Sequence, residues 1–270
     1  MPVANINGVD LNYEVTGQGP VVVFLHGMTG STQDWANQVP VLSPNYRVVA
    51  LDMRGHGKSE APKAESEYSI PIFADDVLGL LDLLSINKCC LVGHSIGGFT
   101  ALQFAVIYQH RLAGLVLVDT SSGPFGKEQN SSHRLSLKLI ELASSQGLEA
   151  AFDYDACHNP MRIAKFKQHP ELKEITRQKV LRTSVEGYIY GPMAFPKWQP
   201  VTPKLSLIKV PTLIYCGEED VAFAGAVKIL EKGISGSELI TIPGVGHNPH
   251  EEAPEIFNQT LLKFLARVKC

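Results

Sequence analysis

The sequence has no excess of positive charge, no basic cluster and no long apolar run. Lys and Arg total 24 against 27 Asp and Glu, a formal charge of −3, so a nucleic-acid partner is not expected. The longest apolar stretches, residues 21–25 and 115–118, are far too short to cross a bilayer. The N-terminus lacks the basic and apolar regions of a signal peptide, so the sequence predicts a soluble, cytoplasmic protein.

Cysteine is scarce too, with Cys89, Cys90, Cys157, Cys216 and Cys270 as the only five. The number is odd, and none of them forms a C-x-x-C pair, so a disulfide framework is not expected. Three lie in apolar runs, where cysteine usually behaves as a small hydrophobic residue. We therefore expect reduced thiols, with Cys89, Cys90 and Cys216 in the core.

Short apolar runs bounded by turn residues recur along the chain. They are continuous rather than alternating, which is typical of strands buried on both faces of a parallel sheet. The runs are residues 21–25, 47–51, 89–92, 115–118, 212–216 and 239–242. Helical spacing between them, as at 70–84 and 96–108, predicts an α/β fold, and residues 3–15 around Asn7-Gly8 predict an edge hairpin. We expect an eight-stranded, mostly parallel sheet flanked by helices.

The alternation of strands and helices stops after Asp119 and resumes near residue 210. The intervening segment has helical patterns and several prolines near its end, and it contains no convincing strand. Such an insertion between two strands is typical of a lid over a site. We therefore divide the chain into a core of residues 1–122 and 203–270 and a helical cap insertion of residues 123–202.

A G-x-S-x-G motif, Gly93 to Gly97, stands where an apolar strand meets a helix. This is the context in which a strained turn exposes a nucleophilic serine hydroxyl, here that of Ser95, at a helix N-terminus. A second loop, residues 26–31, follows the first buried strand and reaches the same sheet edge. The backbone N–H groups of Met28 and Ile96 are the expected oxyanion hole.

A serine nucleophile needs a histidine base and a carboxylate that orients it. His247 follows the last expected strand in a glycine-flanked loop, whereas its rival His250 lies beside two glutamates at an expected solvated helix start. Of the carboxylates that follow the 212–216 strand, Asp220 is favoured over Glu218 and Glu219, which are longer and more plausibly solvated.

Asp119, at another strand end, is the second choice for the acid. The remaining histidines are read as surface, cap or turn residues. No pair of them has metal-ligand spacing, so no metal and no cofactor are expected.

In combination these motifs resemble the α/β-hydrolase superfamily over essentially the whole chain. The resemblance rests on His26-Gly27, the turn at 52–59, the 93–98 segment, Asp220 and His247. It implies a triad of Ser95, Asp220 and His247, an oxyanion hole at Met28 and Ile96, and a structural role for the 52–59 turn. The serine argues against the related epoxide hydrolases and haloalkane dehalogenases, and the loop after Gly27 lacks the glycine run of H-G-G-G lipases and esterases.

The first functional hypothesis is a serine carboxylesterase acting on a small, uncharged ester. One alternative keeps the triad but cleaves a lactone or the carbon–carbon bond of a β-diketone, with a cap arginine (Arg134, Arg162 or Arg177) holding a substrate carboxylate. A second alternative is a receptor that binds a small molecule with little turnover. Cap aromatics are the candidate pocket residues, chiefly Phe125, Tyr188 and Trp198.

Overall fold

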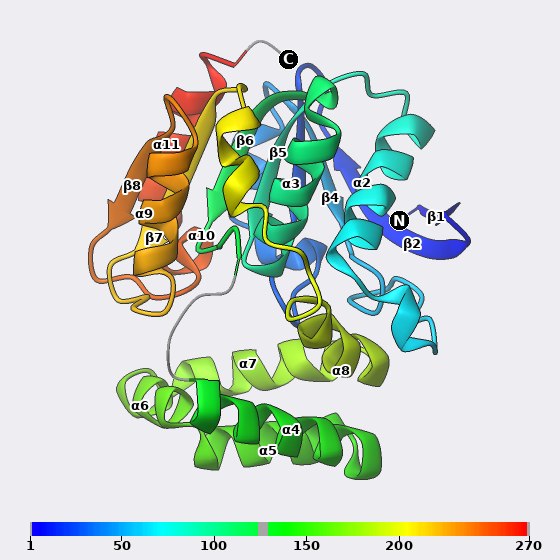
Figure 1. Ribbon diagram of the computed structural model, residues 1–270, viewed down its shortest axis with the longest axis vertical. Helices are drawn as coiled ribbons and strands as arrows, with labels where there is room; N and C mark the ends of the chain where they lie inside the picture. Colours follow the sequence, from blue (N-terminus) through cyan, green and yellow to red (C-terminus); the bar gives the residue numbers. More distant parts are fainter. Residues whose placement is uncertain (1, 124–128, 269–270) are drawn as a thin grey trace.

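The computed structural model describes residues 2–123 and 129–268, with an eight-stranded sheet at its centre (Figure 1). The strand order is β1-β2-β4-β3-β5-β6-β7-β8. The strands are β1 Val3–Ile6, β2 Val9–Thr16, β3 Val21–Leu25, β4 Arg47–Leu51, β5 Cys89–His94, β6 Leu112–Val118, β7 Thr212–Gly217 and β8 Glu238–Ile242. β2 pairs antiparallel with β1 and β4, and the other neighbours pair parallel. The predicted edge hairpin and mostly parallel sheet are therefore confirmed.

Helices cover both faces of the sheet, as expected for strands buried on two sides. One face packs against α2 Ile70–Leu83, α3 Ile96–Ile107 and α9 Ala224–Gly233, and the other against α11 Pro254–Leu265 and the segment around Trp35. The shorter helices are η1 Thr32–Trp35, α1 Val39–Leu42, η2 Glu65–Glu67, η3 Gln109–Arg111, η4 Thr202–Leu207 and α10 Pro249–Glu252. Cys89, Cys90 and Cys216 are buried in this core, as the sequence predicts.

Among the described residues, the five α-helices between β6 and β7 form a separate layer, at the bottom of Figure 1. They are α4 Gln129–Gln146, α5 Leu148–His158, α6 Pro160–Gln168, α7 Glu171–Arg182 and α8 Val185–Ala194. Their apolar faces meet in a small cluster of their own, which includes Leu142, Phe152, Val180 and Ile189. This helical insertion is consistent with the predicted cap; its limits at residues 123 and 202 stay a prediction. No helix within the described ranges combines the length and apolarity needed to span a membrane.

Candidate active site

Ser95 occupies a tight turn between β5 and α3. Its backbone has φ 51° and ψ −114°, a conformation that costs a non-glycine residue about 1–3 kcal/mol. The flanking glycines leave no room for side chains, because a Cβ on Gly93 would lie 2.3 Å from the carbonyl oxygen of Gly97 and one on Gly97 would lie 2.5 Å from that of Leu25. The close packing of strand and helix holds the strained turn and leaves Ser95 partly exposed.

His247 and Asp220 meet at the ends of β8 and β7. His247 Nδ1 lies 2.6 Å from Asp220 Oδ2, so Nδ1–H donates to the carboxylate and Nε2 is left to accept a proton. Asp220 is buried and His247 is half-buried. The ring of Phe223 stacks on the imidazole at 4.9 Å.

His247 lies close to the turn that holds Ser95, because it contacts His94, the residue that precedes Ser95. His94 Nε2–H donates to the carbonyl oxygen of His247 at 2.8 Å, and the two rings are 4.9 Å apart. No hydrogen bond joins Ser95 Oγ to His247 among the described residues. The structure thus places the pair of His247 and Asp220 next to the turn that holds Ser95, without a hydrogen bond between Ser95 and His247.

Asp119, the second choice for the acid, also lies at this edge but in a different state. It is fully buried, its Oδ1 accepts the N–H of Gly217 at 3.1 Å, and its Oδ2 has no partner among the described residues. Burial, together with the charge of Asp220, raises the pKa of Asp119 to about 9. The raised pKa favours the protonated form of Asp119, whereas Asp220 holds the imidazole. Glu218 and Glu219 are exposed.

The loop expected to form the oxyanion hole runs directly against the serine turn. A Cβ added to Gly27 would lie 2.5 Å from His94 Nδ1 and 3.5 Å from Ser95 Cβ. Neither the N–H of Met28 nor that of Ile96 donates to another described residue, so both are available to a developing oxyanion.

The 52–59 turn orders this loop, in line with its expected structural role. Asp52 Oδ1 accepts the N–H of Thr32 at 2.6 Å, and the N–H of Met53 donates to His26 Nε2 at 3.0 Å. Arg54, buried beneath the turn, forms a bidentate pair with Asp76 at 2.7 and 2.8 Å.

The expectation of a solvated His250 is wrong, because this side chain is fully buried. It packs between Trp35, at a ring separation of 4.5 Å, and His94, at 4.7 Å. Burial, reinforced by the charge of Lys179, lowers its pKa well below the usual histidine value, so the ring stays neutral. The neighbouring glutamates suggested an exposed helix start, but the cap covers this end of α10 through Lys179 on α7.

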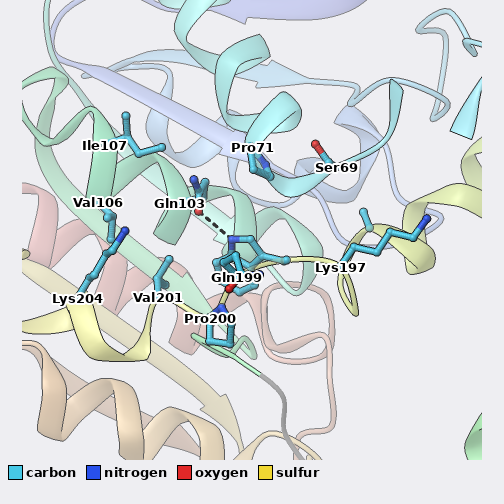
Figure 2. Close-up of a pocket in the computed structure, with 12 residues that line it drawn as sticks. Ser69, Pro71, Gln103, Val106, Ile107, Lys197, Gln199, Pro200, Val201 and Lys204 are labelled. Atoms are coloured by element: carbon cyan, nitrogen blue, oxygen red, sulfur yellow. Dashed lines mark hydrogen bonds between the residues drawn. The ribbon is translucent and has the colours of Figure 1, made fainter. Parts of the chain in front are cut away.

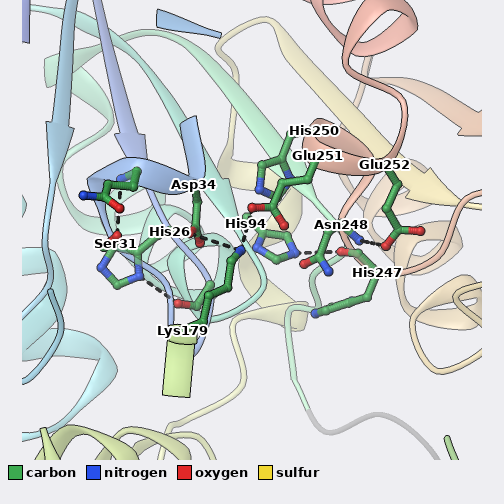
Figure 3. Close-up of polar contacts among 12 residues, drawn as sticks. His26, Ser31, Asp34, His94, Lys179, His247, Asn248, His250, Glu251 and Glu252 are labelled. Carbon is green, nitrogen blue, oxygen red and sulfur yellow. Dashed lines mark hydrogen bonds and ion pairs between the residues drawn. The ribbon is translucent and has the colours of Figure 1, made fainter. Parts of the chain in front are cut away.

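Lys179 reaches from α7 of the cap into a cluster of core side chains, which Figure 3 shows beside His94 and His250. Its Nζ lies 3.2 Å from Asp34 Oδ1 and 2.5 Å from Glu251 Oε1. Asp34, His250 and Glu251 come within metal-ligand spacing, as do Asp119, Asp220 and His247. In the first group the ammonium of Lys179 already pairs with both carboxylates, and in the second His247 Nδ1 is taken by Asp220. Neither group therefore resembles a built metal site.

The three candidate pocket residues have different positions. Phe125 lies outside the described residues. Tyr188 packs into the cap's own apolar cluster, and burial raises its pKa to about 12. Trp198 is buried, and its Nε1–H donates to Gln103 Oε1 at 2.8 Å on α3. Trp198 also lines a cavity of about 540 Å³ between α2, α3 and residues 194–204 (Figure 2), whose lining does not include Ser95 or His247.

Two aromatic residues that lie near His247, Phe99 and Phe223, were not predicted from the sequence. Phe99 lies one turn after Ser95 on α3 and stacks on Phe195 at 4.4 Å. Phe99 lies 6.5 Å from Phe223, which in turn stacks on His247. This row of rings leads from the cap's exit segment to the imidazole. The one indication in the sequence that Phe99 lies near the site is its spacing of four residues, about one helical turn, from Ser95.

Comparisons with known proteins agree with the observed fold. The model of the α/β hydrolase fold family matches residues 20–254, and the chain belongs to that family. Its relatives carry out several reactions. A Bacillus subtilis (strain 168) protein, whose assignment as a 2-succinyl-6-hydroxy-2,4-cyclohexadiene-1-carboxylate synthase is provisional, is 31% identical, over 99% of this chain and 100% of its own.

Two solved structures cover the chain equally fully. A thermophilic esterase from Thermogutta terrifontis superimposes with a TM-score of 0.86 at 28% identity, over 100% of both chains. The enol-lactonase from Burkholderia xenovorans LB400 gives a TM-score of 0.85 at 28% identity, over 98% of this chain and 100% of its own. The fold is thus shared with a protein described as an esterase and with one described as an enol-lactonase.

Proposed function

We propose that the protein is a serine carboxylesterase that cleaves small, uncharged esters through an acyl-enzyme on Ser95. The observation that carries the proposal is the 2.6 Å contact of His247 with Asp220 beside the strained turn of Ser95. A serine, a histidine and an acid in these contexts are the minimum set for acyl transfer.

In the proposed mechanism Ser95 Oγ attacks the ester carbonyl while His247 Nε2 takes its proton. Asp220 fixes the imidazole tautomer and stabilises the imidazolium. The N–H groups of Met28 and Ile96 bind the oxyanion, a contribution of roughly 2.7–4 kcal/mol for each donor. His247 passes the proton to the leaving alcohol, and a water that His247 then activates releases the acid from Ser95.

Two features support an uncharged substrate. The rings nearest the base, Phe223 and Phe99, are apolar, as is typical of small-molecule sites. Of the cap arginines considered as carboxylate clamps, Arg162 already pairs with Asp155 at 3.1 Å, Arg177 already pairs with Glu149, and Arg134 is exposed.

A second candidate keeps the same residues and changes the bond to a lactone or a carbon–carbon bond. The enol-lactonase structure favours the lactone. A Paraburkholderia xenovorans (strain LB400) 2-hydroxy-6-oxononadienedioate/2-hydroxy-6-oxononatrienedioate hydrolase, 28% identical over 96% of this chain and 91% of its own, favours the carbon–carbon bond.

The test is steady-state turnover of p-nitrophenyl esters, acetate through decanoate, by wild type, Ser95→Ala, Asp220→Asn and Asp119→Asn. We expect kcat to fall by about 10⁶ in Ser95→Ala and by about 10⁴ in Asp220→Asn. Asp119→Asn is the matched control, since an amide resembles the protonated acid, and should keep activity within a few-fold. Ester turnover unchanged in Ser95→Ala, or lost in Asp119→Asn but not in Asp220→Asn, would contradict the assignment.

Parallel assays separate the alternatives. Turnover of an enol-lactone or a vinylogous diketone at a higher kcat/KM than any ester, and abolished in Ser95→Ala, would favour the second candidate. Fast multiple turnover of any of these substrates excludes a receptor that only binds its ligand.

A further inference from the structure

The loop that carries His247 is held by its backbone on both sides of the histidine. The N–H of Gly246 donates to Glu252 Oε2 at 2.9 Å, and the N–H of Asn248 donates to Glu252 Oε1 at 3.2 Å. The carbonyl of His247 itself accepts from His94. One carboxylate, at the end of α10, thus spans the residues before and after His247.

The same carboxylate is bound by the cap. Lys165 Nζ, on α6, lies 2.9 Å from Glu252 Oε1, the oxygen that also accepts from Asn248. Both side chains are partly shielded, with exposed fractions of 29% for Lys165 and 25% for Glu252. Burial raises the pKa of Glu252, but the N–H of Gly246 and the ammonium of Lys165 outweigh it and leave the pKa lowered. The carboxylate is therefore ionised at neutral pH.

We propose that Glu252 is a positioning residue for His247, and that its ion pair with Lys165 links the orientation of the His247 imidazole to the position of the cap on the core. The inference rests on the proposed role of His247. Glu252 touches no reacting atom in this arrangement; it fixes the two peptide groups from which the imidazole projects.

The expected size of the effect follows from geometry. Among the described residues no hydrogen bond joins Ser95 to His247, so the proposed proton transfer depends on a further approach of the ring. A misplacement of about 1 Å at such a site can lower a rate by about 100-fold. In Glu252→Gln one of the two loop N–H groups would face an amide NH₂ instead of an acceptor, which loosens the loop without emptying the space.

The experiment compares kcat and KM for Glu252→Gln, Lys165→Gln, Lys165→Arg and Lys167→Gln. Lys167 is an exposed lysine on the same helix and serves as the matched control. We expect kcat to fall about tenfold in Glu252→Gln and about threefold in Lys165→Gln, each with a smaller change in KM. Lys165→Arg should restore most of the loss because it keeps the charge, and Lys167→Gln should match wild type.

A second readout does not depend on turnover. The proton that His247 Nδ1 shares with Asp220 should give a downfield ¹H NMR resonance, identified by its disappearance in His247→Gln. Glu252→Gln and Lys165→Gln should shift or broaden it, and Lys167→Gln should leave it unchanged.

The outcomes separate the two proposals. If Ser95→Ala is inactive while Glu252→Gln and Lys165→Gln match wild type in kcat and in the resonance, this inference is wrong and the proposed function stands. If wild type hydrolyses no ester, the proposed function fails, and the resonance alone decides whether Glu252 and Lys165 position His247.

Discussion

The cap meets the core on two sides, and different forces hold the two contacts. At the start of α8 the contact is made to a backbone carbonyl of the core: the N–H and the Oγ–H of Ser184 donate to the carbonyl oxygen of Gly55 at 3.0 and 2.8 Å, and Gly187 lies against the same carbonyl. At α6 and α7 it is made by lysines, with Lys165 on Glu252 and Lys179 between two carboxylates. The first contact depends on shape at short range, whereas the second depends on charge. A cap attached in this way should respond differently on its two sides to sterics and to salt.

The largest expected effect comes from Gly187→Ala, which breaks the shape-dependent side. The new Cβ would lie 2.1 Å from the carbonyl oxygen of Gly55, and a backbone atom cannot move aside as a flexible side chain can. We expect a loss of about 3 kcal/mol in the free energy of unfolding and a raised KM, measured by denaturant unfolding and by ester kinetics. Gly225→Ala, where an added Cβ meets nothing within 4 Å, is the control and should be neutral or slightly stabilising. Equal effects of the two substitutions would show that the close approach at α8 does not hold the cap.

Lys179→Met breaks the charge-dependent side and should be the next largest. It leaves Asp34 and Glu251 facing each other without the ammonium, at a site where the lysine side chain is 24% exposed. Because the site is only partly open to solvent, we expect a loss of about 2 kcal/mol in the free energy of unfolding. Thermal unfolding of Lys179→Met and of Lys173→Met, an exposed lysine on the same helix, measures it. A Tm for Lys179→Met equal to that of the control would contradict the inferred role of the buried ion cluster.

A higher salt concentration should distinguish the charge-dependent side from the shape-dependent side, with a smaller change in stability than the two substitutions above. Raising ionic strength from 0.1 to 1 M shortens the screening length from about 10 Å to about 3 Å and weakens the partly exposed Lys165–Glu252 pair. We expect the loss of stability in Lys165→Gln, about 0.5 kcal/mol at low salt, to vanish at 1 M, while that in Gly187→Ala persists. The measurement is the difference in unfolding free energy from wild type at each salt concentration. A salt-independent loss in Lys165→Gln would mean that packing, not charge, holds α6.

The smallest expected effect is that of Lys63→Gln, a charge change on the shape-dependent side. Lys63 pairs with Glu186 at 2.5 Å, but its side chain is 83% exposed. Exposed pairs of this kind contribute less than about 1 kcal/mol, so we expect a change in Tm within experimental error. A loss comparable to that of Lys179→Met would remove the distinction between the two sides.

Much of the core could be predicted because its signals are local. The runs at 21–25 and 47–51 became β3 and β4 with the same limits, since a strand buried on both faces needs consecutive apolar residues. The glycines around Ser95 predicted the turn, because only glycine fits where the strand and the helix approach closely. Asp220 and His247 followed from their places after strands, and the structure brings them together.

The failures concern long-range contacts between charged residues. His250 was predicted to be solvated because Glu251 and Glu252 follow it, and nothing in the local pattern shows that lysines from the cap neutralise those glutamates. The raised pKa of Asp119 could not be predicted either, because it depends on burial between β6 and β7. Tyr188 packs against the cap's own cluster, and its role as a pocket residue stays a prediction.

The order of the strands also has a consequence in time. Ser95 follows β5, near the middle of the sheet, whereas Asp220 and His247 follow β7 and β8 at its edge. A ribosome that adds about 5–20 residues per second would therefore release the proposed nucleophile roughly 10–30 seconds before its proposed base. During synthesis the nascent chain would carry a serine turn with no histidine to activate it. The proposed hydrolytic activity would appear only when the last strand of the sheet is in place, so an incomplete chain would not yet act on the proposed ester substrates.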